Sequence, residues 1–98
     1  MKKLYISHPN VERSPEEEAE FKQKIVEKVS TYIDEIVTLL PEYSNDEPGA
    51  YDITRLVNSL MIMSAADVVY FAHGWENSRE CVIQHMCALQ YGLITIEA

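Results

Sequence analysis

Two short polar segments of the chain hold side chains that could bind a ligand. The first, Ser7 to Pro9, follows the apolar run Leu4 to Ile6, and the second, His73 to Trp75, follows the apolar run Val68 to Phe71. If both apolar runs are parallel strands of one sheet, the polar segments lie together at its carboxyl edge, where open α/β sheets bind their ligands. The spacing therefore predicts one site built from both segments.

The residues after the second segment predict a place for an anion. Asn77 followed by Glu80 indicates a reciprocal cap at the start of a helix, and Gly92 indicates the end of that helix. Backbone amides at a helix start bind phosphate, and Arg79 adds a forked cation. The expected ligand-binding residues are Ser7, His8, Gly74, Trp75, Asn77, Ser78 and Arg79.

Several of these residues also have a purely structural interpretation. Gly74 can permit a turn, Ser78 can help to cap the helix, and Trp75 can cover the core. His85 lies two helical turns beyond Ser78, and we interpret it as a buried, hydrogen-bonded core histidine.

The remaining histidines and cysteines predict neither a metal site nor a disulfide. His8 and His73 share the predicted sheet edge, but neither their spacing nor a nearby pair of carboxylates matches a zinc site. Cys81 and Cys87 are six residues apart in one predicted helix, about 9 Å along its axis, and face different directions. They cannot bridge each other there, so we expect two reduced cysteines, no metal and no cofactor.

The first helix follows from a capping pattern and from apolar periodicity. Ser14, Pro15 and Glu17 have the arrangement of a capped helix start. A strand over residues 35–40 and a surface loop from Pro41 to Gly49 are expected to follow this helix. Its inner face is predicted from spacings of three and four residues as Phe21, Ile25, Val29, Tyr32 and Ile33.

The second half of the chain completes an α/β pattern. Val68 to Phe71 has no polar alternation, which indicates a central strand covered on both faces, and Leu93 to Ile96 is a fourth strand. With right-handed crossovers, the order predicts a small Rossmann-like (flavodoxin-like) open parallel sheet of about four strands, with helices on both faces. A second helix that ends near Ala65 is predicted from the apolar stripe of Ile53, Leu56, Val57, Leu60, Met61 and Met63. We expect its methionines to fill gaps in the core.

Length and charge limit the class of protein. The 98 residues are 47% hydrophobic, which fits a single domain over residues 1–98 whose modest core makes a homodimer the expectation. A net charge of −8 disfavours nucleic acid as a partner, because binding to its phosphates needs clustered Lys and Arg. No apolar run is long enough for a membrane span or a signal peptide, so we expect a cytoplasmic protein with no membrane partner.

Two motifs resemble a known family. They are Tyr5 to Pro9 near the start and Gly74 to Arg79, the string GWENSR, late in the chain. Both are similar to an uncharacterised, often phage-borne family related to nucleoside 2-deoxyribosyltransferases and nucleoside 5′-monophosphate N-glycosidases. The resemblance spans most of the domain, and residues 35–50 match only in layout. It implies a Rossmann-like, dimeric fold with a nucleoside or nucleotide as ligand.

The resemblance also implies catalytic positions. That superfamily cleaves or exchanges an N-glycosidic bond with a glutamate nucleophile on the last helix, an aspartate on the preceding helix and a tyrosine on the first strand. Tyr5 matches the tyrosine, whereas Gln84 stands in the glutamate position and Ser59 in the aspartate position. A glutamine amide has no anionic oxygen for nucleophilic attack, and a serine hydroxyl has no suitable pKa for acid-base catalysis at neutral pH. His8 and Glu80 replace family glycines, and Glu80 at the helix start competes with a bound phosphate.

Three functions remain open, because a fold alone does not choose among them. The first, which we favour, is a nucleoside- or nucleotide-binding relative with impaired or lost N-glycosidase activity. The second is an active deoxyribosyltransferase or nucleotide N-glycosidase with a rearranged catalytic set that uses Glu80 or Glu76 as its carboxylate. The third is a phage-type interaction or inhibitor protein that has kept the fold without the site.

Overall fold

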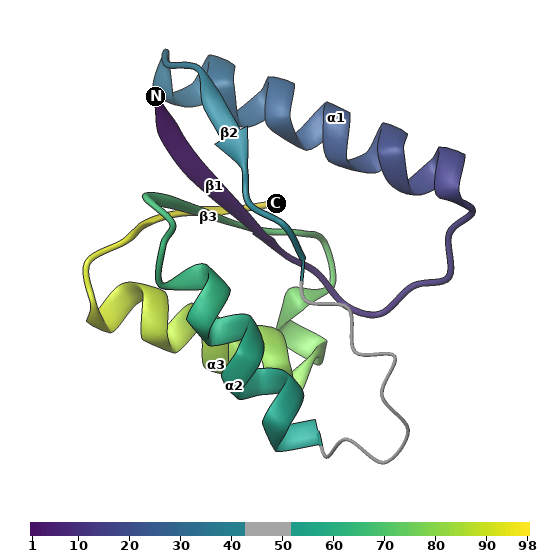
Figure 1. Cartoon of the computed structure of the whole chain (residues 1–98), viewed down its shortest axis with the longest axis vertical. Coiled ribbons are helices and arrows are strands. Elements are labelled where there is room, and N and C mark those ends of the chain that lie inside the picture. The colour runs from purple at the N-terminus through teal and green to yellow at the C-terminus, as the bar shows by residue number, and fades with distance from the viewer. Residues whose placement is uncertain (43–51) are drawn as a thin grey trace.

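The fold is an α/β arrangement in which helices cover both faces of one parallel sheet. The computed structural model describes residues 1–42 and 52–98. In Figure 1, α1 covers one face of the sheet, and α2 and α3 cover the other. The predicted α/β class, with a small open parallel sheet, is confirmed. In chain order the elements are β1 (Lys2–Ser7), α1 (Pro15–Ile33), β2 (Val37–Leu39), α2 (Asp52–Met63), β3 (Val68–Phe71), the 3₁₀ turn η1 (Trp75–Asn77), α3 (Arg79–Gln90) and β4 (Ile94–Glu97).

The strand order places the crevice at the carboxyl ends of β1 and β3. The order is β2-β1-β3-β4, and all neighbouring strands are parallel. The chain moves from β1 to one side to form β2, then crosses to the other side to form β3, so the strand order reverses between β1 and β3. Ligands of open α/β sheets bind outside the carboxyl ends at such a reversal. Ser7 pairs with Phe71 at this edge, so the two predicted polar segments begin there together.

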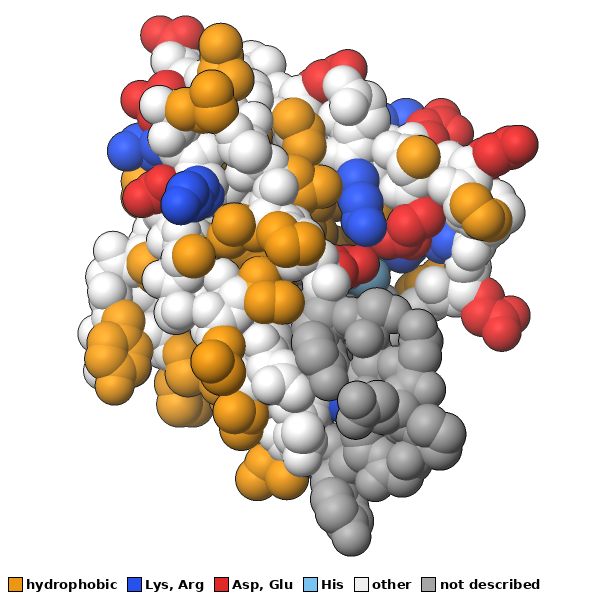
Figure 2. All heavy atoms as spheres, viewed as in Figure 1, with side chains coloured by type: hydrophobic (Ala, Val, Ile, Leu, Met, Phe, Trp, Pro, Cys, Tyr) orange, Lys and Arg blue, Asp and Glu red, His pale blue; other side chains and the backbone are white. Residues whose placement is uncertain are grey.

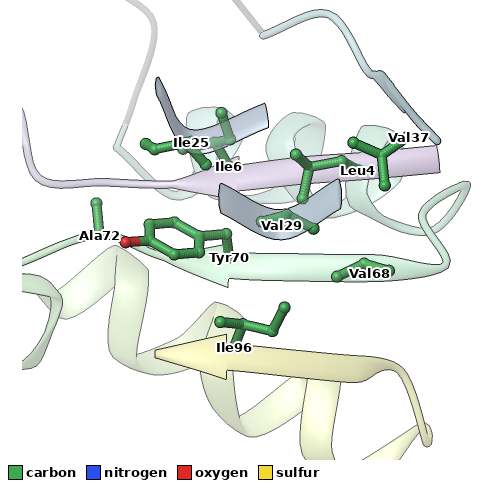
Figure 3. Close-up of a cluster of buried hydrophobic side chains, with 9 residues drawn as sticks. All are labelled: Leu4, Ile6, Ile25, Val29, Val37, Val68, Tyr70, Ala72 and Ile96. Carbon is green, nitrogen blue, oxygen red and sulfur yellow. The ribbon is translucent and has the colours of Figure 1, made fainter. Parts of the chain in front are cut away.

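Side chains of the two central strands alternate between two cores. Because successive residues of a strand point to opposite faces, Ser7 continues the α2 and α3 side of β1, and His8 continues the α1 side. The core on the α1 side, drawn in Figure 3, contains Leu4, Ile6, Ile25, Val29, Val37, Val68, Tyr70, Ala72 and Ile96. The core on the other side contains Tyr5, Met63, Ala66, Val69, Phe71 and Ala88.

The start of α1 has the predicted capping box. Ser14 Oγ accepts a hydrogen bond from the Glu17 amide (3.1 Å), and the Glu17 carboxylate accepts one from the Ser14 amide (3.0 Å). Both bonds satisfy amides that a helix start leaves unpaired. The helix therefore begins at Pro15, where the sequence predicts it.

The buried faces of α1 and α2 are narrower than the apolar spacing predicts. Tyr32 was expected in the core but is 74% exposed, because Ile33 takes the inward place in the last turn of α1. On α2, Leu60 and Met63 pack against the core, whereas half of the predicted stripe faces away from the sheet. Those exposed residues are Ile53 (70%), Val57 (50%) and Met61 (67%), so the core role predicted for Met61 is wrong.

The cap of α3 differs from the predicted one. Asn77 lies in η1, and Ser78 is the N-cap residue, with its Oγ accepting a hydrogen bond from the Cys81 amide (3.4 Å). The predicted reciprocal cap between Asn77 and Glu80 is wrong, because the 3₁₀ turn moves the first helical residue to Arg79.

The remaining elements differ from the expectations only at their ends. β2 is shorter than the predicted strand over 35–40, and β4 begins and ends one residue later than predicted. Gly92 adopts a left-handed conformation (φ +73°) just after α3, as a glycine stop requires. Most of the loop predicted from Pro41 to Gly49 lies outside the described residues. Within residues 1–42 and 52–98, every helix is too short or too polar to cross a membrane.

Candidate ligand-binding site

A buried cluster of uncharged polar side chains lies behind the carboxyl end of β1. Ser7 Oγ donates a hydrogen bond to Gln84 Oε1 (2.5 Å), and Gln84 Nε2 donates one to Ser59 Oγ (2.9 Å). Ser59 Oγ in turn donates to the Leu56 carbonyl (2.8 Å). The exposed fractions of the three polar residues are only 2 to 4%. β1, α2 and α3 each contribute one side chain to this chain of hydrogen bonds.

Tyr5 belongs to the same cluster and holds its proton firmly. Burial, together with the negative charges of Glu80 and Glu42, raises the pKa of Tyr5 to about 12, although hydrogen bonds to Ser59 and Gln84 oppose the shift. A phenol in this state donates hydrogen bonds at neutral pH and does not act as a base. We call Tyr5, Ser7, Ser59 and Gln84 the neutral cluster.

The neutral cluster offers hydrogen bonds without a nucleophile. Both ends of the Gln84 amide are already bonded within the protein, and an amide carries no negative charge. The nearest carboxylate on the same helix is Glu80, whose Oε1 lies 3.5 Å from Gln84 Nε2. The structure thus brings the predicted catalytic positions Tyr5, Ser59 and Gln84 together, in an arrangement that has no negatively charged group.

A cavity lies next to the cluster, between the beginnings of α2 and α3. It has a volume of about 580 Å³, within the size range of ordinary small-molecule sites. Glu80 lines the cavity and also contacts Gln84, so it connects the cavity to the neutral cluster. The cavity is lined by Asn10, Ile53, Arg55, Leu56, Ser78, Arg79, Glu80 and Ile83.

The positive groups of this cavity stand out in an acidic chain. Arg55 and Arg79 are the only Lys or Arg residues after Lys28, and both line the cavity. Two helices also begin at its wall, and the amides at a helix start carry partial positive charge. Among the described residues of the lining, Glu80 is the one carboxylate, and it opposes them. The balance of these groups suits an anionic ligand.

The predicted ligand-binding residues separate into two groups. Ser78 and Arg79 line the cavity. The other five predicted residues are not part of its wall, and they are Ser7, His8, Gly74, Trp75 and Asn77. Gly74 adopts a left-handed conformation (φ +89°) that a turn requires, and a side chain there would meet Pro9 at 3.5 Å. Asn77 is exposed in η1, and Ser7 belongs to the neutral cluster.

Trp75 lies away from the cavity, in an aromatic stack. Its ring stacks on His85 with a centroid distance of 4.2 Å, and Phe71 meets His85 edge-on at 4.8 Å. His85 Nε2 also lies 2.6 Å from a Glu97 carboxylate oxygen. His85 is therefore hydrogen-bonded and packed against aromatic rings, as expected, but it is only partly buried, not a buried core residue. Both cysteines, Cys81 and Cys87, are free thiols.

His8 lies on the α1 side, in a network of charges. Its Nδ1 is 3.0 Å from the Pro9 carbonyl oxygen, and its Nε2 contacts Glu42 Oε1. Both partners are acceptors, so the ring needs a proton on each nitrogen to satisfy them. The hydrogen bond to Glu42 raises the pKa of His8, which burial partly opposes, and the same bond lowers the pKa of Glu42.

Two further cations compensate the carboxylates near His8. Lys22 Nζ lies 3.4 Å from Glu42 and 3.8 Å from Glu18, and Arg13 Nη1 lies 3.4 Å from Glu18. The ligand atoms of His8, Glu18 and Glu42 fall within 4.8 Å of one another, a spacing that could hold a metal ion. Because cations already pair with both carboxylates, the geometry favours an ion-pair network. We call His8, Arg13, Glu18, Lys22 and Glu42 the ionic network.

Sequence reasoning missed the residues that depend on contacts between distant segments. Glu42 meets His8 across the ends of two neighbouring strands, and no local pattern marks it. Arg55 had a usable signal, since it and Arg79 are isolated cations in the last 70 residues. Asn10 lies two residues beyond His8 and reaches the cavity from the loop after β1.

The fold and the cavity together define a small α/β protein with a positively lined pocket at the reversal of its strand order. Comparison of the chain with protein-family models, with curated proteins and with solved structures found no match.

Proposed function

We propose that the chain binds a nucleoside or nucleotide in the cavity between α2 and α3, and that its N-glycosidase activity is impaired or lost. In this proposal it is a cytoplasmic member of the family whose motifs Tyr5 to Pro9 and Gly74 to Arg79 resemble. One observation carries the proposal. Gln84, in the position of the family's nucleophile, is 2% exposed, and both ends of its neutral amide are bonded to serines.

The lining of the cavity supports a nucleotide as the ligand. Arg55 and Arg79, with the amides at the start of α3, suit a phosphate. Ile53, Leu56 and Ile83 offer an apolar wall for a base or a sugar. A monophosphate is therefore expected to bind more tightly than the corresponding nucleoside, although Glu80 weakens this preference.

Loss of the family's N-glycosidase chemistry is expected because the neutral cluster contains no carboxylate. Cleavage through a covalent intermediate needs a carboxylate that can attack the sugar carbon. Gln84 and Ser59 are uncharged, and Tyr5 keeps its proton at neutral pH. Hydrogen bonds within the cluster occupy the polar atoms of Gln84.

Incubation with a panel of ribonucleoside and deoxyribonucleoside 5′-monophosphates tests both parts of the proposal. We expect calorimetry to detect binding and chromatography to detect no free base. Robust release of free base would replace the proposal with an active enzyme. If no nucleoside, nucleotide or phosphate bound, the chain would instead be an interaction or inhibitor protein that has kept only the fold.

An active enzyme is the second candidate, and the position of Glu80 favours it. Glu80 lines the cavity and lies 3.5 Å from Gln84 Nε2, so its carboxylate is next to the family's nucleophile position. If turnover is found, Glu80→Gln should abolish it. Glu76→Gln is the matched control, because Glu76 is exposed in η1 and does not line the cavity.

A gain of activity would show directly what the cluster lacks. The double variant Gln84→Glu with Ser59→Asp places carboxylates at both family positions. We expect it to release free base from a nucleotide that the unaltered chain only binds. Circular dichroism establishes that the variant is folded. A folded, nucleotide-binding variant without turnover would contradict the assignment of these two positions.

A further inference from the structure

Charged side chains are scarce in the half of the chain that forms α2 and α3. On the face shown in Figure 2, charged side chains gather over and around α1, whereas the part formed by α2 and α3 is mostly hydrophobic or uncharged. A carboxylate that lines the ligand cavity, as that of Glu80 does, is therefore a rare feature of this half. The charged residues after Leu56 in the sequence are Asp67, Glu76, Arg79, Glu80 and Glu97.

The cavity wall presents Glu80 beside the groups that suit a phosphate. Glu80 is the second residue of α3, so its side chain leaves the first helical turn next to Arg79 and to the amides of the helix start. There its charge repels an anion and reduces what these groups contribute to phosphate binding. A carboxylate at this place favours binding only if the ligand offers hydrogen-bond donors close to its phosphate.

Contacts with the neutral cluster show where the Glu80 carboxylate lies. Its Oε1 is 3.5 Å from Nε2 of Gln84, one turn further along α3. The negative charge of Glu80 is also one of the causes that raise the pKa of Tyr5 on β1. The carboxylate thus lies between the cavity and the neutral cluster. An ionised carboxylate accepts about four hydrogen bonds, and the contact with Gln84 uses one of these positions, so a ligand in the cavity can supply others.

We infer that Glu80 binds the neighbouring 2′- and 3′-hydroxyls of a ribose, so that the cavity selects ribonucleotides over 2′-deoxyribonucleotides. This inference rests on the proposed function, because it concerns the ligand of the same cavity. Two neighbouring hydroxyls can donate to the two oxygens of one carboxylate, and hydrogen bonds to a charged acceptor are stronger than those between neutral groups. Acidic side chains bind the ribose 2′-hydroxyl in this way in dinucleotide-binding α/β sheets.

The covalent order of a nucleotide makes the sugar, not the base, the partner of Glu80. In a 5′-monophosphate the phosphate is joined to the ribose through an O–CH₂ link, and the base lies on the far side of the sugar. With the phosphate at the start of α3, the sugar is the part of the ligand that carries donors nearest to Glu80. The apolar residues of the wall, Ile53, Leu56 and Ile83, remain for the base.

Calorimetry with matched pairs of nucleotides tests this inference. The probes are the ribonucleoside and 2′-deoxyribonucleoside 5′-monophosphates of adenine, guanine, cytosine and uracil. We expect a ribonucleotide to bind the unaltered chain about tenfold more tightly than its 2′-deoxy partner, because the partner lacks one hydrogen bond to a charged group. The 3′-deoxy form of the tightest-binding ribonucleotide should lose a similar factor, because it lacks the other hydroxyl.

Two variants separate recognition of the ribose from stabilisation of the helix. Glu80→Gln keeps the shape of the side chain and removes its charge, so the preference for ribose should fall to about twofold or less. The 2′-deoxyribonucleotide should bind this variant at least as tightly as before, because its phosphate is no longer repelled. A weaker helix start would instead lower the affinity for both members of a pair. Glu76→Gln is the matched control and should keep the full preference, since Glu76 is exposed in η1 and does not line the cavity.

The outcomes distinguish failure of this inference from failure of the proposed function. Equal binding of the two members of each pair to the unaltered chain, or a Glu80→Gln variant that keeps the full preference for ribose, would overturn the inference while nucleotide binding stands. A preference for one base that Glu80→Gln removes, without any preference for ribose, would assign Glu80 to the base and would also overturn it. If no nucleotide binds at all, the proposed function fails and the inference fails with it.

Discussion

Ser7 and His8 are adjacent at the end of β1, but Ser7 lies among uncharged polar side chains and His8 lies among charged ones. Ser7 is 2% exposed and belongs to the neutral cluster with Gln84 and Ser59. His8 is partly exposed and belongs to the ionic network with Glu42. Neutral groups with satisfied hydrogen bonds can be buried at little cost, whereas charged groups remain near water and respond to pH. Successive residues of a strand point to opposite faces, so the neutral cluster lies on one side of the sheet and the pH-sensitive ionic network on the other.

The largest expected effect comes from placing a charge in the neutral cluster. Gln84→Glu should lower the free energy of unfolding at pH 7 by about 3 kcal/mol, because it buries a carboxylate near Glu80. Burial raises the pKa of the new carboxyl, so the loss should be small below about pH 4 and should grow as the pH rises. Urea denaturation at several pH values measures this change.

Gln90→Glu provides the control for that variant. Gln90 is an exposed residue at the end of the same helix, so its change should cost less than about 1 kcal/mol. If both variants lost the same free energy of unfolding, or if the loss at residue 84 did not depend on pH, a buried charge would not be the cause of the loss. The neutral cluster would then not need to be uncharged for the chain to fold.

A smaller effect is expected when the cluster loses one hydrogen-bonding partner. Ser59→Ala removes the acceptor of the Gln84 amide and should destabilise the chain by about 1 to 2 kcal/mol. Ser64→Ala is the matched control, because Ser64 is exposed at the end of α2 and its Oγ donates a hydrogen bond to the Met61 carbonyl. Its change should be close to zero in the same denaturation experiment. A Ser59 variant as stable as the Ser64 variant would remove the distinction between buried and exposed hydroxyls.

The smallest effect is expected in the ionic network, and it should depend on pH. Because the pKa of His8 is raised in the folded chain, His8 stabilises the fold fully at pH values below its ordinary pKa of 6.5. This stabilisation is lost as the pH rises through the raised pKa. Because the pKa of Glu42 is lowered in the folded chain, Glu42 stabilises the fold fully at pH values above its ordinary pKa of 4.5. This stabilisation is lost as the pH falls through the lowered pKa. The pair therefore stabilises most between about pH 4.5 and 6.5.

Glu42→Gln should remove that maximum. We expect a loss of less than about 1 kcal/mol in this window and little change above it, because partly exposed ion pairs contribute little. Thermal unfolding of the variant and of an exposed control, Glu12→Gln, measures the difference. A loss that is the same at every pH would show that Glu42 acts through packing instead of through the charge of His8.

The fold could be predicted from the sequence because its signals are local. The uninterrupted apolar run of β3 indicated a covered central strand, and Ser14 with Glu17 indicated the start of α1. The cap of α3 was harder, because Asn77 and Ser78 are both good capping residues and only the 3₁₀ turn decides between them. Spacing also could not tell which apolar residues of α2 face the sheet, so Met61 was placed in the core although it is exposed.

The candidate site could be predicted only in part, because much of it is assembled from distant segments. The resemblance pointed to Tyr5, Ser59 and Gln84, and the structure brings these three together. The cavity was not visible in the sequence, since its wall combines the loop after β1 with the first turns of two helices. The pairing of His8 with Glu42 likewise depends on the order of strands, which local patterns do not encode.

A calorimetric comparison of a nucleoside 5′-monophosphate with its nucleoside tests the central claim most directly. In the unaltered chain the monophosphate should bind more tightly, with no free base released, and Arg55→Gln should weaken monophosphate binding by about tenfold while leaving nucleoside binding unchanged. Equal affinities for the two ligands, an Arg55 variant that binds as the unaltered chain does, or free base in the cell after titration would contradict the claim that this cavity holds a nucleotide without cleaving it.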